Sequence, residues 1–233
     1  MKTKFITGLL SLVVVTLVGC GQGNGNGSGK NGAGASFDIN QYPISTLTQD
    51  VKDSLAFMGN EERLAYDVYM NLYNYHLNNG DTIKQFKNIS TKSEIKHIGI
   101  VQDLVRRYNL GADDVTNVEN PVSDNSIAQT NMPMGEYDIP EIQELYDALY
   151  EKGIKSVQDA LEVGCMVEVT DINDLDRWIQ KAQNANATDV IAGFEILRNG
   201  SYNHYWAFDK GLKNIGVSEG CAVLGTEYAK TQR

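Results

Sequence analysis

Proline is scarce in this chain, and long stretches contain none. Residues 44–120 and 141–233 are free of it, and the four prolines are Pro43, Pro121, Pro133 and Pro140. Because proline removes a backbone hydrogen-bond donor and clashes with the preceding helical turn, these stretches can form long helices. Sustained apolar–polar alternation, which marks strands, is also missing. The sequence therefore predicts an all-α fold.

The N-terminus has the features of an export signal. Lys2 and Lys4 precede an apolar run, residues 5–18, that is too short for an ordinary membrane span. The tetrad LVGC, which ends at Cys20, resembles the lipobox of prokaryotic lipoproteins, in which the signal is cut before a lipidated cysteine. An ordinary signal peptide or an uncleaved anchor are the alternatives. We expect a signal peptide over 1–19 and an extracytoplasmic protein, anchored through lipid on Cys20 to the cell membrane or outer membrane.

Positive charge is also in short supply. The chain has 20 Lys and Arg against 30 Asp and Glu, a formal net charge of −10. Signal cleavage would change this to −12, because it removes Lys2 and Lys4 and no acidic residue. Nucleic-acid binding needs basic surface, so we expect no nucleic acid as a partner. The same charge disfavours broad contact with an anionic membrane face.

Residues 21–36 read GQGNGNGSGKNGAGAS and contain no apolar residue larger than alanine. Such a segment cannot build a core and is typical of a flexible tether. We expect residues 20–36 to be the lipidated cysteine and this tether. The remaining residues, 37–233, suit one helical domain with a sizeable core.

Apolar residues recur at steps of three and four along four segments, as on one face of a helix. We expect long helices over about 46–78, 91–109, 156–184 and 188–214, and a short helix near 141–151. The sequence leaves open whether the first helix is broken near Gly59. About thirty residues separate the second long helix from the short helix near 141–151, which is long for a loop in a compact domain. One long crossover at this point is what a ferritin-like four-helix bundle requires.

In that architecture, a carboxylate site for two metal ions takes one Glu from each of two helices and a Glu-x-x-His pair from each of the others. The pair Glu94 and His97 has this spacing, whereas Ser201 stands three residues before His204. The candidate metal ligands are Glu62, Glu94, His97, Glu168, Asp171 and His204.

Four motifs carry a family resemblance: EERLAYDVY, SEIKHIGIVQDLVRRYNL, SVQDALEVGCMVEVTDINDL and NGSYNHYWAF. In this order they resemble the ferritin-like superfamily, and specifically the prokaryotic family catalogued as domain of unknown function 2202. The resemblance covers about residues 55–212 and implies a four-helix bundle with a metal site, but no established activity. Ferritins and rubrerythrins have a shared Glu where this chain has Ser201. Asp171 is the candidate replacement; if it faces solvent, one metal ion is expected instead of two.

Several candidates have simpler explanations. Glu62 follows Asn60 and can be an acid in a first helical turn. Glu94 follows Thr91 at the spacing of a capping box. His204 can be a hydrogen-bonded core histidine. Glu168 is harder to explain without a site, because it is the only charge in VGCMVEV and an unpaired buried carboxylate is costly.

Carboxylate and imidazole ligands suit iron or manganese, and zinc would bind without redox chemistry. We expect iron, with two ions, in a metal-dependent oxidoreductase that consumes peroxide or oxidises ferrous iron. The alternative is a non-catalytic binding or structural lipoprotein with a relic site. Tyr69 and Tyr73 would either relay electrons or pack. No Cys-rich rubredoxin-like segment is present, so an enzyme would need an external electron donor.

Cysteine is rare as well. With Cys20 lipidated, Cys165 and Cys221 are the two thiols left for an oxidising compartment, and no CxxC spacing is present. We expect a disulfide that ties the C-terminal segment GCAVLG to the helix near Glu168. Two separate buried thiols are the alternative.

Overall fold

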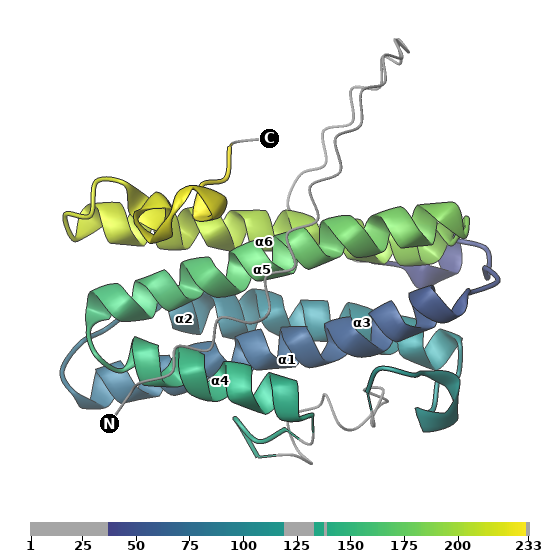
Figure 1. Cartoon of the computed structure of the whole chain (residues 1–233), viewed down its shortest axis with the longest axis horizontal. Coiled ribbons are helices and arrows are strands. Elements are labelled where there is room, and N and C mark those ends of the chain that lie inside the picture. Colours follow the sequence, from purple (N-terminus) through teal and green to yellow (C-terminus); the bar gives the residue numbers. More distant parts are fainter. Residues whose placement is uncertain (1–36, 119–132, 138, 232–233) are drawn as a thin grey trace, which may run out of the picture. The chain divides into compact units, whose positions relative to one another are not determined.

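The computed structural model describes residues 37–118, 133–137 and 139–231, and within these ranges the chain is helical without a β-strand (Figure 1). This confirms the predicted all-α helical bundle. The helices are α1 (Gln49–Asn78), α2 (Lys84–Ile89), α3 (Ile95–Arg107), α4 (Pro140–Gly153), α5 (Val157–Asn184) and α6 (Thr188–Asn214). The predicted signal peptide, Cys20 and the tether lie outside the described residues. None of the helices in the described ranges has both the length and the apolar character needed to span a membrane.

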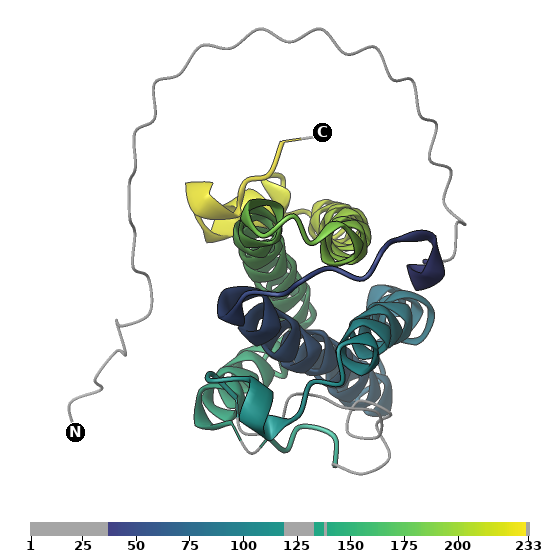
Figure 2. The ribbon, with the colours of Figure 1, turned by 90° about the vertical axis from the view of Figure 1, so that its right-hand side faces the viewer.

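Four helices, α1, α3, α5 and α6, form the bundle, which Figure 2 shows close to end on. α5 packs along α6, while α1 packs against both α3 and α5, and α3 also contacts α6. The short helix predicted near 141–151 is α4, which packs against α1 and α5. The long connection between α3 and α5 therefore contains α4, which lies beside α1 (Figure 1).

The first helix continues through Gly59 without a break. It begins at Gln49, where Thr48 occupies the N-cap position, so Glu62 lies far inside it. The explanation of Glu62 as an acid in a first turn is therefore wrong. Its side chain is fully buried, where a carboxyl needs compensating partners.

The second bundle helix starts earlier than predicted, at Lys84, and continues into α3 through a π-helical turn, Ser90–Glu94. Thr91 is not an N-cap, because its hydroxyl donates to the Lys87 carbonyl at 2.6 Å from within the helix. A threonine inside a helix can bond in this way to a carbonyl of the preceding turn. In the sequence alone, such a threonine cannot be distinguished from one at an N-cap. The capping-box explanation of Glu94 is therefore wrong.

The hydrophobic core consists of two main clusters separated by a polar layer. On α6, Phe194 and Leu197 belong to one cluster, and Tyr205 and Phe208 belong to the other. Ser201 lies between them, followed one turn later by His204, and both side chains are buried. The apolar stripes thus build the bundle on either side of this layer and hold its polar groups away from water.

Cys165 of α5 and Cys221 of the short C-terminal 3-10 helix Gly220–Leu224 are joined by a disulfide. Both residues are fully buried, and their Cα atoms are 5.6 Å apart. The bond attaches the C-terminal segment to α5 one turn before Glu168.

Replacing both cysteines by alanine should lower the free energy of unfolding by about 4 kcal/mol, because the bond closes a loop between residues 56 apart. Urea unfolding of the double variant and of oxidised wild type would measure this. Reduced wild type serves as the control and should resemble the variant. Equal stability of all three forms, or two titratable thiols in unreduced denatured wild type, would contradict the expectation.

Candidate metal centre

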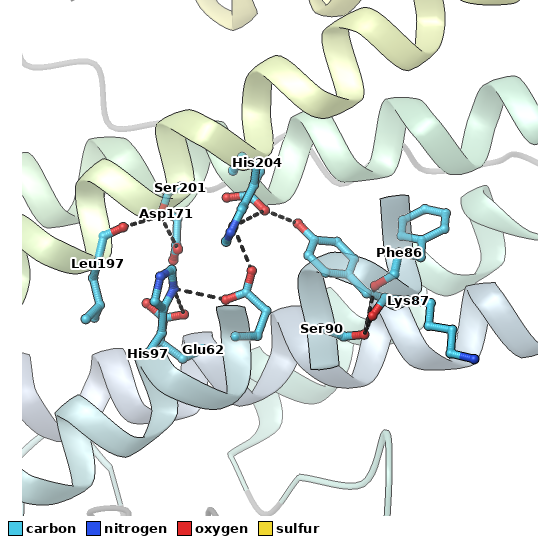
Figure 3. Close-up of polar contacts among 12 residues, drawn as sticks. Glu62, Phe86, Lys87, Ser90, His97, Asp171, Leu197, Ser201 and His204 are labelled. Carbon is cyan, nitrogen blue, oxygen red and sulfur yellow. Dashed lines mark hydrogen bonds and ion pairs between the residues drawn. The ribbon is translucent and has the colours of Figure 1, made fainter. Parts of the chain in front are cut away.

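The polar layer brings together side chains from all four bundle helices, and Figure 3 shows several of them pointing toward one another. Each is at most 6% exposed. The six predicted ligands all lie in this layer; they are Glu62, Glu94, His97, Glu168, Asp171 and His204.

Glu94 lies between the two imidazoles. His97 Nδ1 is 3.1 Å from Glu94 Oε2 and 3.1 Å from Glu62 Oε2. His204 Nδ1 is 2.8 Å from Glu94 Oε1 and 3.4 Å from Glu168 Oε1. Each oxygen of Glu94 thus faces a different histidine, and the two rings are stacked with centroids 5.3 Å apart.

Several of these buried atoms have no hydrogen-bond partner, although they are close to one another. They are Glu62 Oε1, both carboxylate oxygens of Glu94, and His204 Nδ1. Ligand atoms about 2.1 Å from an ion lie about 3.0 Å apart at right angles and about 3.4 Å apart in a tetrahedron. The separations given above, 2.8 to 3.4 Å, are those of ordinary ion pairs and are also compatible with atoms that surround a cation. The residues present fit a metal.

Burial dominates the acid–base properties of the carboxyls. It raises the pKa of Glu62 to about 7, against the lowering effect of His97. It also raises the pKa of Asp171 well above its usual value, and the charge of Glu62 adds to this. Burial acts in the same direction on Glu94, but the positive charges of His204 and His97 outweigh it and lower the pKa of this carboxyl.

The two imidazoles are stabilised in their charged form. Burial alone would lower the pKa of each, but Glu62 and Glu94 raise the pKa of His97 well above its usual value. Glu94 and Glu168 raise the pKa of His204 to about 10. A metal ion on Nδ1 of either ring would compete with the proton at that atom.

Of the two predicted tyrosines, only Tyr69 contacts the site. Its hydroxyl donates to Glu168 Oε1 at 2.6 Å, and its side chain is fully buried. Its ring packs against Phe86 and Phe208. Tyr73 is partly buried, with the Lys87 ammonium 5.5 Å from its ring centroid, which is a packing position.

Asp171 points into the bundle. Its carboxyl is hydrogen-bonded to the Ser201 hydroxyl at 3.0 Å, and Ser201 also donates toward the Leu197 carbonyl at 3.1 Å. Asp171 is 4% exposed and Ser201 is fully buried. The alternative in which Asp171 faces solvent is therefore wrong, and its side chain meets α6 at Ser201.

Three residues near the site were not predicted. Glu61 is buried beside Glu62, and its carboxyl interacts with that of Asp174 of α5. The acidic pair at 61–62 and the spacing of three from Asp171 to Asp174 were the available signals. Gly200 had no signal, because its role lies in a contact across helices: a Cβ there would be 2.2 Å from His97 Nε2.

Gly200→Ala should therefore displace His97, lower the bound metal and destabilise the protein by about 1–3 kcal/mol through overpacking. The matched control is Gly99→Ala in α3, where an added Cβ meets nothing within 4 Å. Removing that helical glycine should stabilise the protein by about 0.5–1 kcal/mol. Elemental analysis and urea unfolding measure both effects. Full metal content in Gly200→Ala would show that an added Cβ at this position does not displace His97 from the site.

Comparisons with known proteins cover most of this domain. Residues 51–228, which include every candidate ligand, match the family described as an uncharacterized protein domain, DUF2202. The chain is 38% identical over 178 residues to the uncharacterized protein MJ0754 of Methanocaldococcus jannaschii, covering 76% of this chain and 83% of that protein. The crystal structure of the hypothetical protein MJ0754 from Methanococcus jannaschii resembles this structure with a TM-score of 0.61 and 36% identity, over 75% of this chain and 86% of that one.

Proposed function

We propose, from the premise that the chain belongs to the DUF2202 family, that it is a ferritin-like metalloprotein whose buried site binds iron or manganese for the oxidation of ferrous iron or the consumption of peroxide. The observation that carries the proposal is the cluster of Glu94, His97 and His204, whose ligand atoms are buried and within 4.8 Å of one another. Carboxylate and imidazole suit these metals, and zinc is the redox-inactive competitor.

The contacts favour two adjacent ions. Glu62 and His97 would hold one, and Glu168 and His204 the other, with Glu94 shared between them. This distribution over four helices is that of the ferritin-like carboxylate sites. Asp171 would supply the fourth carboxylate from α5, because Ser201 offers only a hydroxyl. The buried carboxyls also outnumber the two imidazoles, and divalent ions would compensate this excess charge.

When bound, the metal ions supply one-electron chemistry toward oxygen or peroxide. The chain contributes the surroundings. The two apolar clusters exclude water from the layer, and Glu94 orients both histidines from one side. Tyr69 fixes the orientation of Glu168 by its hydrogen bond. An external electron donor remains part of this proposal, as does a position at the outer face of a membrane through lipid on Cys20.

Anaerobic loading of metal-free protein with Fe²⁺, followed by exposure to oxygen or hydrogen peroxide, tests the function. We expect about two ions per chain and oxidation of ferrous iron faster than in buffer, followed with a ferrous-specific chelator. Absence of bound metal would overturn the metal site. Full loading without accelerated oxidation would favour a relic site without turnover.

The rise in Tm caused by metal should increase from pH about 5 to about 8, reaching roughly 5–10 °C at a hundredfold excess over Kd. Folding raises the pKa of Glu62 from 4.5 to about 7 and that of His204 from 6.5 to about 10. These two groups stabilise the metal-free protein fully at a pH below their pKa values in the unfolded chain. The stabilisation is lost as the pH rises through their pKa values in the folded protein. Metal competes with the same protons and binds more tightly as pH rises. Melting curves of both forms measure this, and a shift independent of pH would contradict it.

A further inference from the structure

A second pair of acids lies beside the candidate ligands. The carboxyls of Glu61 of α1 and Asp174 of α5 lie close enough to influence each other electrostatically, and we call these two residues the outer pair. Glu61 is 7% exposed, whereas the side chain of Asp174 is 20% exposed. The outer pair thus joins a buried carboxyl to one that water reaches.

Glu61 has an unsatisfied atom. Its Oε2 is buried and has no hydrogen-bond partner, although its side chain contacts Asp174. Leaving a buried oxygen without a partner is unfavourable. Such an atom calls for a ligand, and an anionic or polar oxygen that faces other carboxyls suits a cation.

The outer pair is continuous with the candidate metal centre. Glu61 directly precedes Glu62, whose charge acts on Glu61, and the charge of Glu61 acts in turn on Asp171. On α5, Glu168, Asp171 and Asp174 recur at steps of three and share a face. Exposure increases along this row, from 1% at Glu168 to 4% at Asp171 and to the partly exposed Asp174. Carboxyls of increasing exposure therefore follow one another along this face of α5.

We propose that the outer pair is a transit site, which receives divalent cations from water and passes them through Asp171 to the metal centre; this rests on the proposed function. Two carboxyls attract a hard cation, but they are too few to hold it against the larger ligand set inside. Arg177 pairs with Asp174 at 2.9 Å, and its guanidinium lies 4.5 Å from the centroid of the Trp178 ring. This arginine side chain is 53% exposed, so an arriving cation can displace it easily.

Loading of metal-free protein with Co²⁺, followed by stopped-flow absorbance, tests the transit site. Glu61→Gln and Asp174→Asn should each slow loading about tenfold or more, since local negative charge changes the association rates of cations by this order, while the final stoichiometry stays that of wild type. Asp176→Asn is the matched control, because it removes the same charge from an exposed position on α5 that pairs with Arg198. It should load at close to the wild-type rate.

The outcomes separate this inference from the proposed function. Wild type that binds no Co²⁺ would overturn both. Wild type that loads fully, with Glu61→Gln and Asp174→Asn at the same rate, would overturn the transit site alone. Equal slowing by Asp176→Asn would also overturn it, because a general charge effect would suffice. A lower final stoichiometry in Glu61→Gln or Asp174→Asn would make these residues ligands of the stored ions instead. Circular dichroism verifies that each variant is folded.

Discussion

Glu94→Gln should reduce bound iron from about two ions per chain to nearly none. Each oxygen of Glu94 faces a different histidine, at 3.1 Å for His97 and 2.8 Å for His204, so one substitution affects both metal positions. Glutamine keeps the shape of the side chain but removes the anionic oxygen that these metals require. Elemental analysis after loading with iron, with circular dichroism to verify folding, measures the effect.

The control for Glu94→Gln is Glu162→Gln, which changes another buried glutamate of a bundle helix. Glu162 is 8% exposed and is held by Lys152 and Gln158 outside the polar layer. It should keep full metal content. Glu62→Gln and Glu168→Gln each affect one imidazole contact and should lose about one ion. Full iron content in Glu94→Gln would show that this glutamate is not a shared ligand.

Deletion of Lys92 should destabilise the protein by about 3–5 kcal/mol, comparable to the loss of a large core side chain, and should remove most of the bound metal. The π-helical turn Ser90–Glu94 holds one residue more than an α-helical turn. Without it, the segment before the turn rotates by about 100° relative to α3. The buried side chains of Phe86 and Ile89 would then face away from the core, or His97 would leave the site.

Lys92→Ala is the control for this deletion. Lys92 is exposed, and its ammonium contacts only the Asn88 side chain among the described hydrogen bonds. The substitution keeps the length of the turn and should change stability by no more than about 0.5 kcal/mol. Urea unfolding and metal content are compared between the two variants. A deletion variant as stable and as metal-rich as Lys92→Ala would show that the π-helical turn does not orient Glu94.

The sequence by itself determined the helical class, the approximate helices and the types of ligand. Proline-free stretches and apolar spacing of three to four are local properties, and α5 and α6 were predicted at the positions that the structure has. Glu168 stood out because a single charge in an apolar helical segment needs a partner. The same local signals failed at Thr91, because a hydroxyl that bonds to the preceding turn gives the pattern of a cap.

Only the tertiary structure decided which of these groups meet. A helical period determines the face of a helix that is buried, but not how far the helix is shifted or rotated against its neighbours. The packing of the two apolar clusters decides this. Because of this packing, Glu94 reaches both histidines. The same packing also places Tyr69 against Glu168 and Asp171 against Ser201. Tyr73 lies on the same helix as Tyr69 but does not contact the site. The contact of Gly200 with His97 and the closeness of Glu61 to Asp174 have the same origin, because they depend on distances between helices that no single segment encodes.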